Sequence, residues 1–88
     1  MNICFLIGKI ISKIEFDFVI GDNKSFKNRK ISIVRFGLKL LDKNIVNIIG
    51  YNNVADFCYQ KLKIGENVLI QGFINNSGKI EIKNIILI

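Results

Sequence analysis

The sequence predicts an all-β domain that contains a single helix, and three observations support this fold class. Apolar and polar side chains alternate with a period of two through most of the chain, which is typical of strands with one buried face. One segment, residues 54–64, changes to a helical spacing. Clusters of glycine, asparagine and aspartate separate the segments. The 88 residues are enough for one small core, so we expect residues 1–88 to form a single domain.

The first predicted strand runs from residue 3 to residue 20, with a change of phase near Gly8. Strands of globular proteins usually have about 3–10 residues, so a strand of this length has to bend. A glycine inside a strand commonly marks a bend or bulge, which places the bend near Gly8. A polar, basic loop is expected to follow, from Gly21 to about Asn28.

Two further strands are predicted at residues 30–41 and 45–51. The segment Asp42-Lys43-Asn44 forms a short hairpin connection between them. The alternation in the longer strand predicts that its inward-facing residues are Val34, Phe36, Leu38 and Leu40.

Residues 54–64 are predicted to form a helix, because their apolar positions are spaced i, i+3, i+4 and i+8. Asn52 or Asn53 can cap its N-terminus, and Gly65 can take the left-handed conformation that ends it. We expect the core to include two small residues, Cys4 and Cys58, and four aromatic ones, Phe16, Phe18, Phe36 and Phe57.

The last two strands are predicted at residues 67–75 and 79–88, joined by a hairpin at Asn76-Ser77-Gly78. The order of elements is therefore β-β-β-α-β-β. A long bent first strand, with one helix between strands three and four, is the layout of an OB-fold, a five-stranded, partly open Greek-key barrel.

The charge of the chain indicates an anionic partner. The formal net charge is +6, and residues 21–45 alone carry seven basic and two acidic side chains, a net of +5. A basic patch focused on one part of a small domain is typical of a protein that binds nucleic acid or an anionic surface. The other interpretation is a charged face that only keeps the protein soluble.

Other classes of function find little support. The chain has no histidine, and its two cysteines match no metal-ligand spacing. No nucleophile has a base beside it, so we expect no enzymatic activity, no catalytic residues, and no metal or cofactor. No apolar run reaches the ~20 residues of a membrane span. No secretory signal is recognisable, so a reduced, cytoplasmic protein without a membrane partner is expected.

Three segments resemble the bacterial single-stranded DNA-binding protein (SSB) family. They are MNICFLIGKI, VRFGLKL and VNIIGYNNVADFCYQKLKIGENVLIQGFI, and they occur in the order that the family has. The segment IQGFI is also similar to primosomal replication protein N (PriB), a shorter dimeric relative. The resemblance implies an OB-fold and sequence-nonspecific binding of single-stranded DNA, in support of DNA replication, recombination or repair. It also implies a homodimer or homotetramer, with replication or primosome proteins as further partners.

The resemblance has departures at the aromatic positions. Members of the family normally stack bases on several aromatic side chains, often tryptophan, and this chain has no tryptophan. Ile45 stands where one such aromatic lies, whereas Tyr51 falls at the aromatic position that ends the third strand. We therefore expect weaker, mostly electrostatic binding that depends strongly on salt.

In an OB-fold, nucleic acid binds across the outer face of strands two and three and the adjoining loops. If the inward set above is correct, Arg35 and Lys39 face outward, next to Asn47 and Tyr51 of the following strand, and Gly37 permits close approach. Basic residues of the first strand and loop flank this face. The predicted nucleic-acid-binding residues are Lys9, Lys13, Lys24, Lys27, Arg29, Lys30, Arg35, Lys39, Asn47 and Tyr51.

Several of these residues, and the function itself, have a second interpretation. Tyr51 either stacks on a base or packs against the start of the helix, and Arg35 and Lys39 either contact phosphates or keep the sheet face hydrated. Phe73 contributes either to packing or to a dimer contact. Isoleucines on the outer face fit a subunit interface better than base contact, namely Ile31, Ile33, Ile45 and Ile49. The alternative function is a PriB-like primosomal or conjugation accessory module that acts mainly through protein–protein contacts.

Overall fold

The computed structural model describes residues 2–21 and 29–88, and for Ile20, Gly21 and Arg29 it describes the backbone alone. The predicted order of strands and helix is confirmed, except that the first long strand is divided in two. Most of the expected basic loop lies outside the described residues. The elements are β1 (Cys4–Ile10), β2 (Glu15–Gly21), β3 (Arg29–Leu40), β4 (Ile45–Tyr51), α1 (Asn53–Lys61), β5 (Asn67–Ile74) and β6 (Ile80–Leu87).

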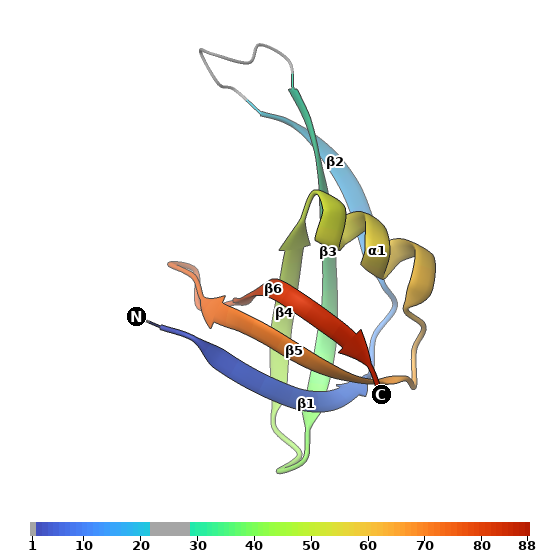
Figure 1. Ribbon diagram of the computed structural model, residues 1–88, viewed down its shortest axis with the longest axis vertical. Coiled ribbons are helices and arrows are strands. Elements are labelled where there is room, and N and C mark those ends of the chain that lie inside the picture. The colour runs from blue at the N-terminus through green and yellow to red at the C-terminus, as the bar shows by residue number, and fades with distance from the viewer. Residues whose placement is uncertain (1, 22–28) are drawn as a thin grey trace.

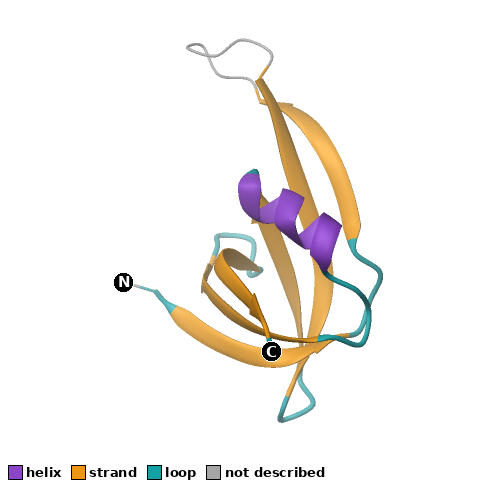
Figure 2. Cartoon of the chain, turned by 45° about the vertical axis from the view of Figure 1, so that its right-hand side comes forward, coloured by secondary structure: helices purple, strands orange, loops and turns teal. Residues whose placement is uncertain are grey.

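Five of the strands close into a barrel. The sheet has the order β1-β5-β6-β4-β3-β2, and an additional pairing of β1 with β3 closes the ring. In the described part of the chain β2 pairs with β3 alone. These two strands continue past the barrel as a projecting arm beside α1 (Figure 1 and Figure 2). This architecture is the predicted OB-fold.

The sequence predicted one continuous strand over residues 3–20, and its division in two is a finding of the structure. The break lies at residues 11–14, where the chain stops pairing with one half of β3 and begins to pair with the other. Gly8 lies instead within β1, where a Cβ atom would be 2.6 Å from the carbonyl oxygen of Lys39. Gly8 is also the residue at which β1, paired with β5, begins to pair with β3 as well, and as a glycine it permits the close approach of β1 to β3.

At this break a side-chain hydrogen bond replaces the missing pairing between strands. The backbone N–H of Gly37 donates a hydrogen bond to Oγ of Ser12 at 2.7 Å. The N–H of Ile11 donates to the carbonyl oxygen of Gly37 at 3.1 Å. Both polar backbone groups of Gly37 on this edge of β3 are thus satisfied although no strand pairs there.

The predicted inward face of β3 is confirmed. Val34, Phe36 and Leu38 are buried, and Leu40 packs against the core at the end of the strand. The helix adds Ala55 and Cys58 to the same core. Further buried side chains come from the remaining barrel strands and the segment after the helix: Ile10, Ile48, Leu62, Val68, Ile70, Ile80 and Ile82.

Helix α1 is shorter than predicted and is capped differently. Asn52 precedes it, but its side chain makes no capping hydrogen bond, and its carbonyl oxygen accepts the N–H of Asp56 at 2.9 Å. Leu62 already has an extended conformation, so the helix ends before Gly65. Gly65 does have a positive φ of 94°, in the turn that leads into β5. Among the described residues no helix is long and apolar enough to span a membrane.

The predicted burial of the phenylalanines is correct only in part. Phe36 is buried and Phe16 is half-buried, whereas Phe18 is 50% exposed and Phe57 is 38% exposed. Phe18 points to the same side of the sheet as the core, but it lies on the arm, beyond the part that the barrel covers. Phe57 lies on a flank of α1 that faces away from the buried residues Ala55 and Cys58.

Candidate nucleic-acid interface

The side of β3 and β4 that faces away from the core, called the outer face below, carries four of the ten predicted site residues. In the antiparallel register, Gly37 lies opposite Asn47, and Lys39 lies opposite Ile45. Arg35 lies on the same face of β3, two residues before Gly37. Tyr51 closes the row at the end of β4, opposite Ile33, and is half-buried. The structure thus brings Arg35, Lys39, Asn47 and Tyr51 onto one surface.

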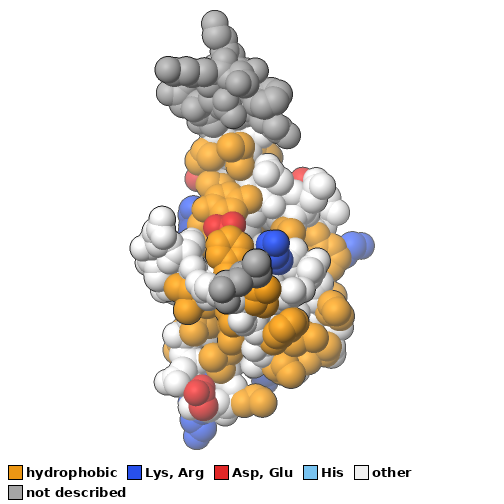
Figure 3. Space-filling model, turned by 60° about the vertical axis from the view of Figure 1, so that its left-hand side comes forward, with side chains coloured by type: hydrophobic (Ala, Val, Ile, Leu, Met, Phe, Trp, Pro, Cys, Tyr) orange, Lys and Arg blue, Asp and Glu red, His pale blue; other side chains and the backbone are white. Residues whose placement is uncertain are grey.

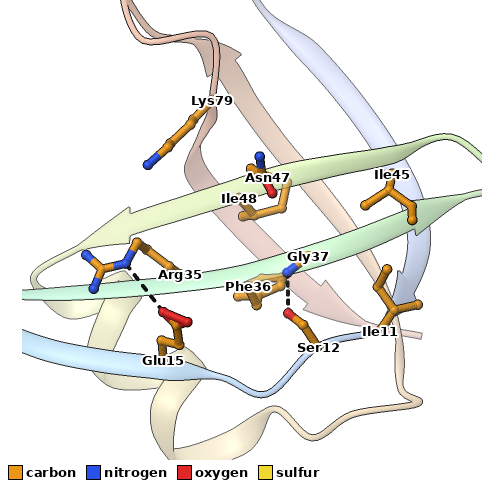
Figure 4. Close-up of a pocket in the computed structure, with 10 residues that line it drawn as sticks. All are labelled: Ile11, Ser12, Glu15, Arg35, Phe36, Gly37, Ile45, Asn47, Ile48 and Lys79. Atoms are coloured by element: carbon orange, nitrogen blue, oxygen red, sulfur yellow. Dashed lines mark hydrogen bonds and ion pairs between the residues drawn. The ribbon is translucent and has the colours of Figure 1, made fainter.

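The centre of the outer face is hollowed into a groove of about 400 Å³. Gly37 lies at its floor, and a Cβ atom there would make only ordinary contacts, 3.4 Å from Oγ of Ser12. In Figure 4 the basic side chains Arg35 and Lys79 lie toward one end, and Ile11 and Ile45 lie toward the other. The full lining consists of Ile11, Ser12, Glu15, Arg35, Phe36, Gly37, Ile45, Asn47, Ile48 and Lys79.

An ion pair holds the guanidinium of Arg35 at the edge of the groove. Nε of Arg35 lies 3.8 Å from Oε2 of Glu15, directly opposite on β2 (Figure 4). The two side chains are 39% and 63% exposed, so the pair is worth at most about 1 kcal/mol. A phosphate that reaches Arg35 therefore competes with a weakly bound carboxylate, and the other guanidinium nitrogens make no ion pair with a described residue.

A second basic cluster lies at the end of the barrel opposite the arm. Lys9 and Lys39 are direct neighbours across the pairing of β1 with β3. Lys43, in the hairpin after β3, borders the same depression of about 610 Å³. Like charges in directly opposed positions of a sheet repel each other, and an anion bound between them relieves this repulsion.

The remaining predicted residues are more dispersed. Lys13 is exposed in the crossing between β1 and β2. Lys30 belongs to β3 instead of the loop, and its register position opposite Ile20 puts its side chain on the face that Val34 shares, away from the groove. Lys24 and Lys27 lie outside the described residues, and Arg29 is described by its backbone alone.

One expected interface residue is corrected by the structure. Ile49 faces outward from β4, but it is only 7% exposed because it lies between Arg35 of β3 and Glu81 of β6. It is therefore not available for a subunit contact. Ile45, on the same face, is 61% exposed and is available, whereas Ile31 and Ile33 are half-buried.

Besides core residues, sequence reasoning missed four residues that line the groove, namely Lys79, Glu15, Ser12 and Ile11. Lys79 precedes β6, and the short parallel pairing of Ile80 with Ile48 brings it beside β4. No local pattern signals that pairing. Ser12 and Ile11 belong to the crossing, which the continuous alternation of residues 3–20 concealed.

Comparison with known proteins supports the fold assignment. No protein family matches the chain, and no curated protein is significantly similar to it in sequence. The SSB domain of a protein from Synechococcus sp. is similar in structure, with a TM-score of 0.74, 16% identity, and coverage of 97% of this chain and 93% of that chain. The mitochondrial single-stranded DNA-binding protein from S. cerevisiae has a TM-score of 0.72 and 19% identity, covering 99% and 93%.

A dimeric structure of the N-terminal domain of PriB from Thermoanaerobacter tencongensis is also similar, with a TM-score of 0.64, 19% identity, and coverage of 99% of this chain and 96% of that chain. The chain therefore has an OB-fold of the type found in SSB and PriB proteins. The resemblance read from the sequence is confirmed at the level of the fold.

Proposed function

We propose that this chain binds single-stranded DNA without sequence preference, through the groove on the outer face of β3 and β4. The observation that carries this proposal is the composition of the groove, which combines basic side chains, exposed aliphatic surface and a glycine floor. A nonspecific site for single-stranded DNA needs cations that follow the phosphates and flat or apolar surfaces for the bases. The groove also lies on the face of the OB-fold that usually binds oligonucleotides.

The geometry supports a division of roles within the groove. Arg35 and Lys79 are placed to contact phosphates at one end, and Lys39 continues the basic track toward Lys9. Bases lie over the backbone of Gly37, where no side chain obstructs them, and against Ile45, whose place in the groove favours base contact over the subunit contact expected from the sequence. The exposed amide of Asn47 offers hydrogen bonds that any base can use.

The experiment that tests this proposal is a fluorescence titration with single-stranded DNA, duplex DNA and RNA of equal length at low salt. We expect the single-stranded DNA to bind more tightly than the duplex, because a duplex hides its base faces from the groove. The double variant Tyr51→Ala with Lys39→Ala is expected to weaken this binding. Absence of binding by the unmodified chain at low salt would overturn the proposal.

We also propose that the chain forms a homodimer or homotetramer, supported by a second apolar surface. Ile3, just before β1, is 50% exposed, and the outward side chains of Phe5 and Ile7 on β1 are 68% and 46% exposed. This apolar surface continues onto the neighbouring strands. Leu69 of β5 lies opposite Ile7, and Ile86 of β6, which is 57% exposed, lies opposite Leu69. Hydrophobic side chains are also prominent over the lower part of the molecule in Figure 3. Contiguous apolar surface of this kind usually marks a protein interface.

The second candidate function is a primosomal or conjugation accessory module that acts mainly through protein contacts. The structural similarity to the PriB domain and the exposed apolar side chains of β1 favour it. The Tyr51→Ala with Lys39→Ala variant separates the two candidates, because unchanged oligonucleotide binding would favour protein contacts. In either case we propose a cytoplasmic role in DNA replication, recombination or repair, the processes in which single-stranded DNA is exposed.

A further inference from the structure

Three aromatic rings from β2 and α1 form a row, called the ladder below, on the face opposite the groove. The rings of Phe16 and Tyr59 stack, with centroids 4.4 Å apart and an interplanar angle of 26°. Phe18 meets Phe16 edge-on, with centroids 5.0 Å apart. The ammonium group of Lys30 lies 4.3 Å from the centroid of the Phe18 ring. Two segments distant in the sequence, β2 and α1, thus build one aromatic surface with a cation at its end.

The outer rings of this ladder are exposed, whereas the central ring is not. Phe16 is half-buried between the other two rings and packs against the core. Tyr59 is 58% exposed and Phe18 is 50% exposed. Aromatic rings are costly to leave in water, and each offers a flat face on which a nucleobase can stack.

The two faces of the arm differ in charge. Within the described residues of β2 and β3, both carboxylates, Glu15 and Asp17, lie on the outer face, opposite Arg35 and Ile33. The inner face carries Phe16 and Phe18 together with Lys30. Arg35 offsets the charge of Glu15 at the groove, so on the outer face it is Asp17 that opposes a polyanion, whereas Lys30 favours one on the inner face of the arm.

From this arrangement we infer that the ladder of Phe18, Phe16 and Tyr59, with Lys30, is a second contact surface for single-stranded nucleic acid. One or two bases stack on the exposed faces of Tyr59 and Phe18. Lys30 moves from the Phe18 ring to the adjoining phosphate, which is a short displacement for a flexible ammonium side chain. Asp56 lies one helical turn before Tyr59, and its carboxylate repels a phosphate at that end of the ladder. The phosphate is therefore bound at the other end, by Lys30.

This inference rests on the proposed function, since it concerns the same ligand, but it uses a separate set of residues. The test measures the affinity of fluorescent oligo-dT for matched variants of one helix. Tyr59→Leu keeps an apolar side chain against Phe16 but removes the flat ring, and Tyr59→Phe keeps the ring. Phe57→Leu is the control, because Phe57 is a similarly placed aromatic on the other flank of α1.

We expect Tyr59→Leu to weaken binding roughly 5-fold or more, which corresponds to the lower end of the usual contribution of one stacked base. Tyr59→Phe and Phe57→Leu should bind like the unmodified chain, and all three variants should melt within a few degrees of it. An oligo-dT that contains 5-iodouracil should also form photocrosslinks to Tyr59 or Phe18.

The same titrations can overturn this inference, and they distinguish that outcome from failure of the proposal that the groove binds single-stranded DNA. If Arg35→Ala with Lys39→Ala abolishes binding while Tyr59→Leu changes nothing, the groove stands and the ladder does not. If Tyr59→Leu weakens binding while the groove variant does not, the ladder stands and the groove proposal fails. Crosslinks that form at groove residues alone likewise exclude the ladder, and no binding by the unmodified chain overturns both.

Discussion

Lys9 and Lys39 lie directly opposite each other across the pairing of β1 with β3 that closes the barrel. Both side chains are exposed, and like charges in directly opposed positions of a sheet are destabilising. The sheet would be more stable with only one of these two charges, because the repulsion between them would be absent. An anionic ligand bound between the two ammonium groups relieves this repulsion.

Removing one of these charges is expected to affect stability and binding in opposite directions. Lys39→Gln should leave the melting temperature unchanged or raise it slightly, because it removes the repulsion with Lys9. The same variant should bind oligo-dT more weakly. If about five phosphates are neutralised by the unmodified chain, its log K falls with log salt at a slope near −3.5, and the variant loses about 0.7 of that slope. A melt and a titration at several salt concentrations check both effects. A lower melting temperature with an unchanged slope would contradict this account.

Two glycines should respond differently to the same substitution. In Gly8→Ala the new Cβ atom meets the carbonyl oxygen of Lys39 at 2.6 Å, so we expect a loss of about 1–3 kcal/mol in the free energy of unfolding. In Gly37→Ala the nearest atom is 3.4 Å away, so stability should change little while the groove floor rises. Gly37→Ala is then expected to weaken oligonucleotide binding. Chemical denaturation and titration of both variants test the contrast, and equal losses of stability would refute it.

Phe5 provides a test of the proposed oligomer. Its side chain is 68% exposed in the single chain, so Phe5→Glu should fold normally but place a charge in the interface. The expected result is a shift to monomer in light scattering at micromolar concentration. Leu41→Glu is the matched control, because Leu41 is 85% exposed in the hairpin after β3. A monomeric unmodified chain would remove the basis of this prediction.

Burial raises the pKa of the Cys58 thiol from 9.0 to about 12. Above pH 9 the unfolded chain releases this proton while the folded chain retains it, so the unfolded state binds fewer protons and stability falls as pH rises. The loss reaches at most about 1.4 kcal/mol per pH unit between pH 9 and 12. Denaturation at pH 8 to 10.5, compared with Cys58→Ala, isolates this contribution. Parallel pH profiles for the two proteins would show that the thiol does not carry it.

The sequence predicted the strands and the inward face of β3 because the side-chain period of a strand is fixed by its backbone. Val34, Phe36 and Leu38 therefore lie where the alternation places them. The same alternation could not show where the barrel ends. Phe18 points to the core side of the sheet but is exposed on the arm, which makes its predicted burial wrong.

The sequence predicted the part of the candidate site that lies on two consecutive strands joined by a hairpin. It did not predict the part that comes from segments distant in the sequence. Arg35 and Asn47 share the outer face because a short hairpin fixes the register of β3 and β4. Lys79 reaches the groove through the parallel contact of β6 with β4, which has no local signature. The ion pair of Arg35 with Glu15 likewise depends on a strand break that the continuous pattern of residues 3–20 did not reveal.

The hydrogen bond from the Gly37 N–H to Ser12 has a consequence for how this barrel can change over generations. The hydrogen bonds between strands are normally made by peptide groups, which every substitution except one to proline retains. Here one position is bridged by a hydroxyl, and Ser12→Ala leaves a partly buried N–H unpaired at a cost of about 1–3 kcal/mol. Selection can therefore adjust the joint between arm and barrel at one side chain, without altering the path of the main chain.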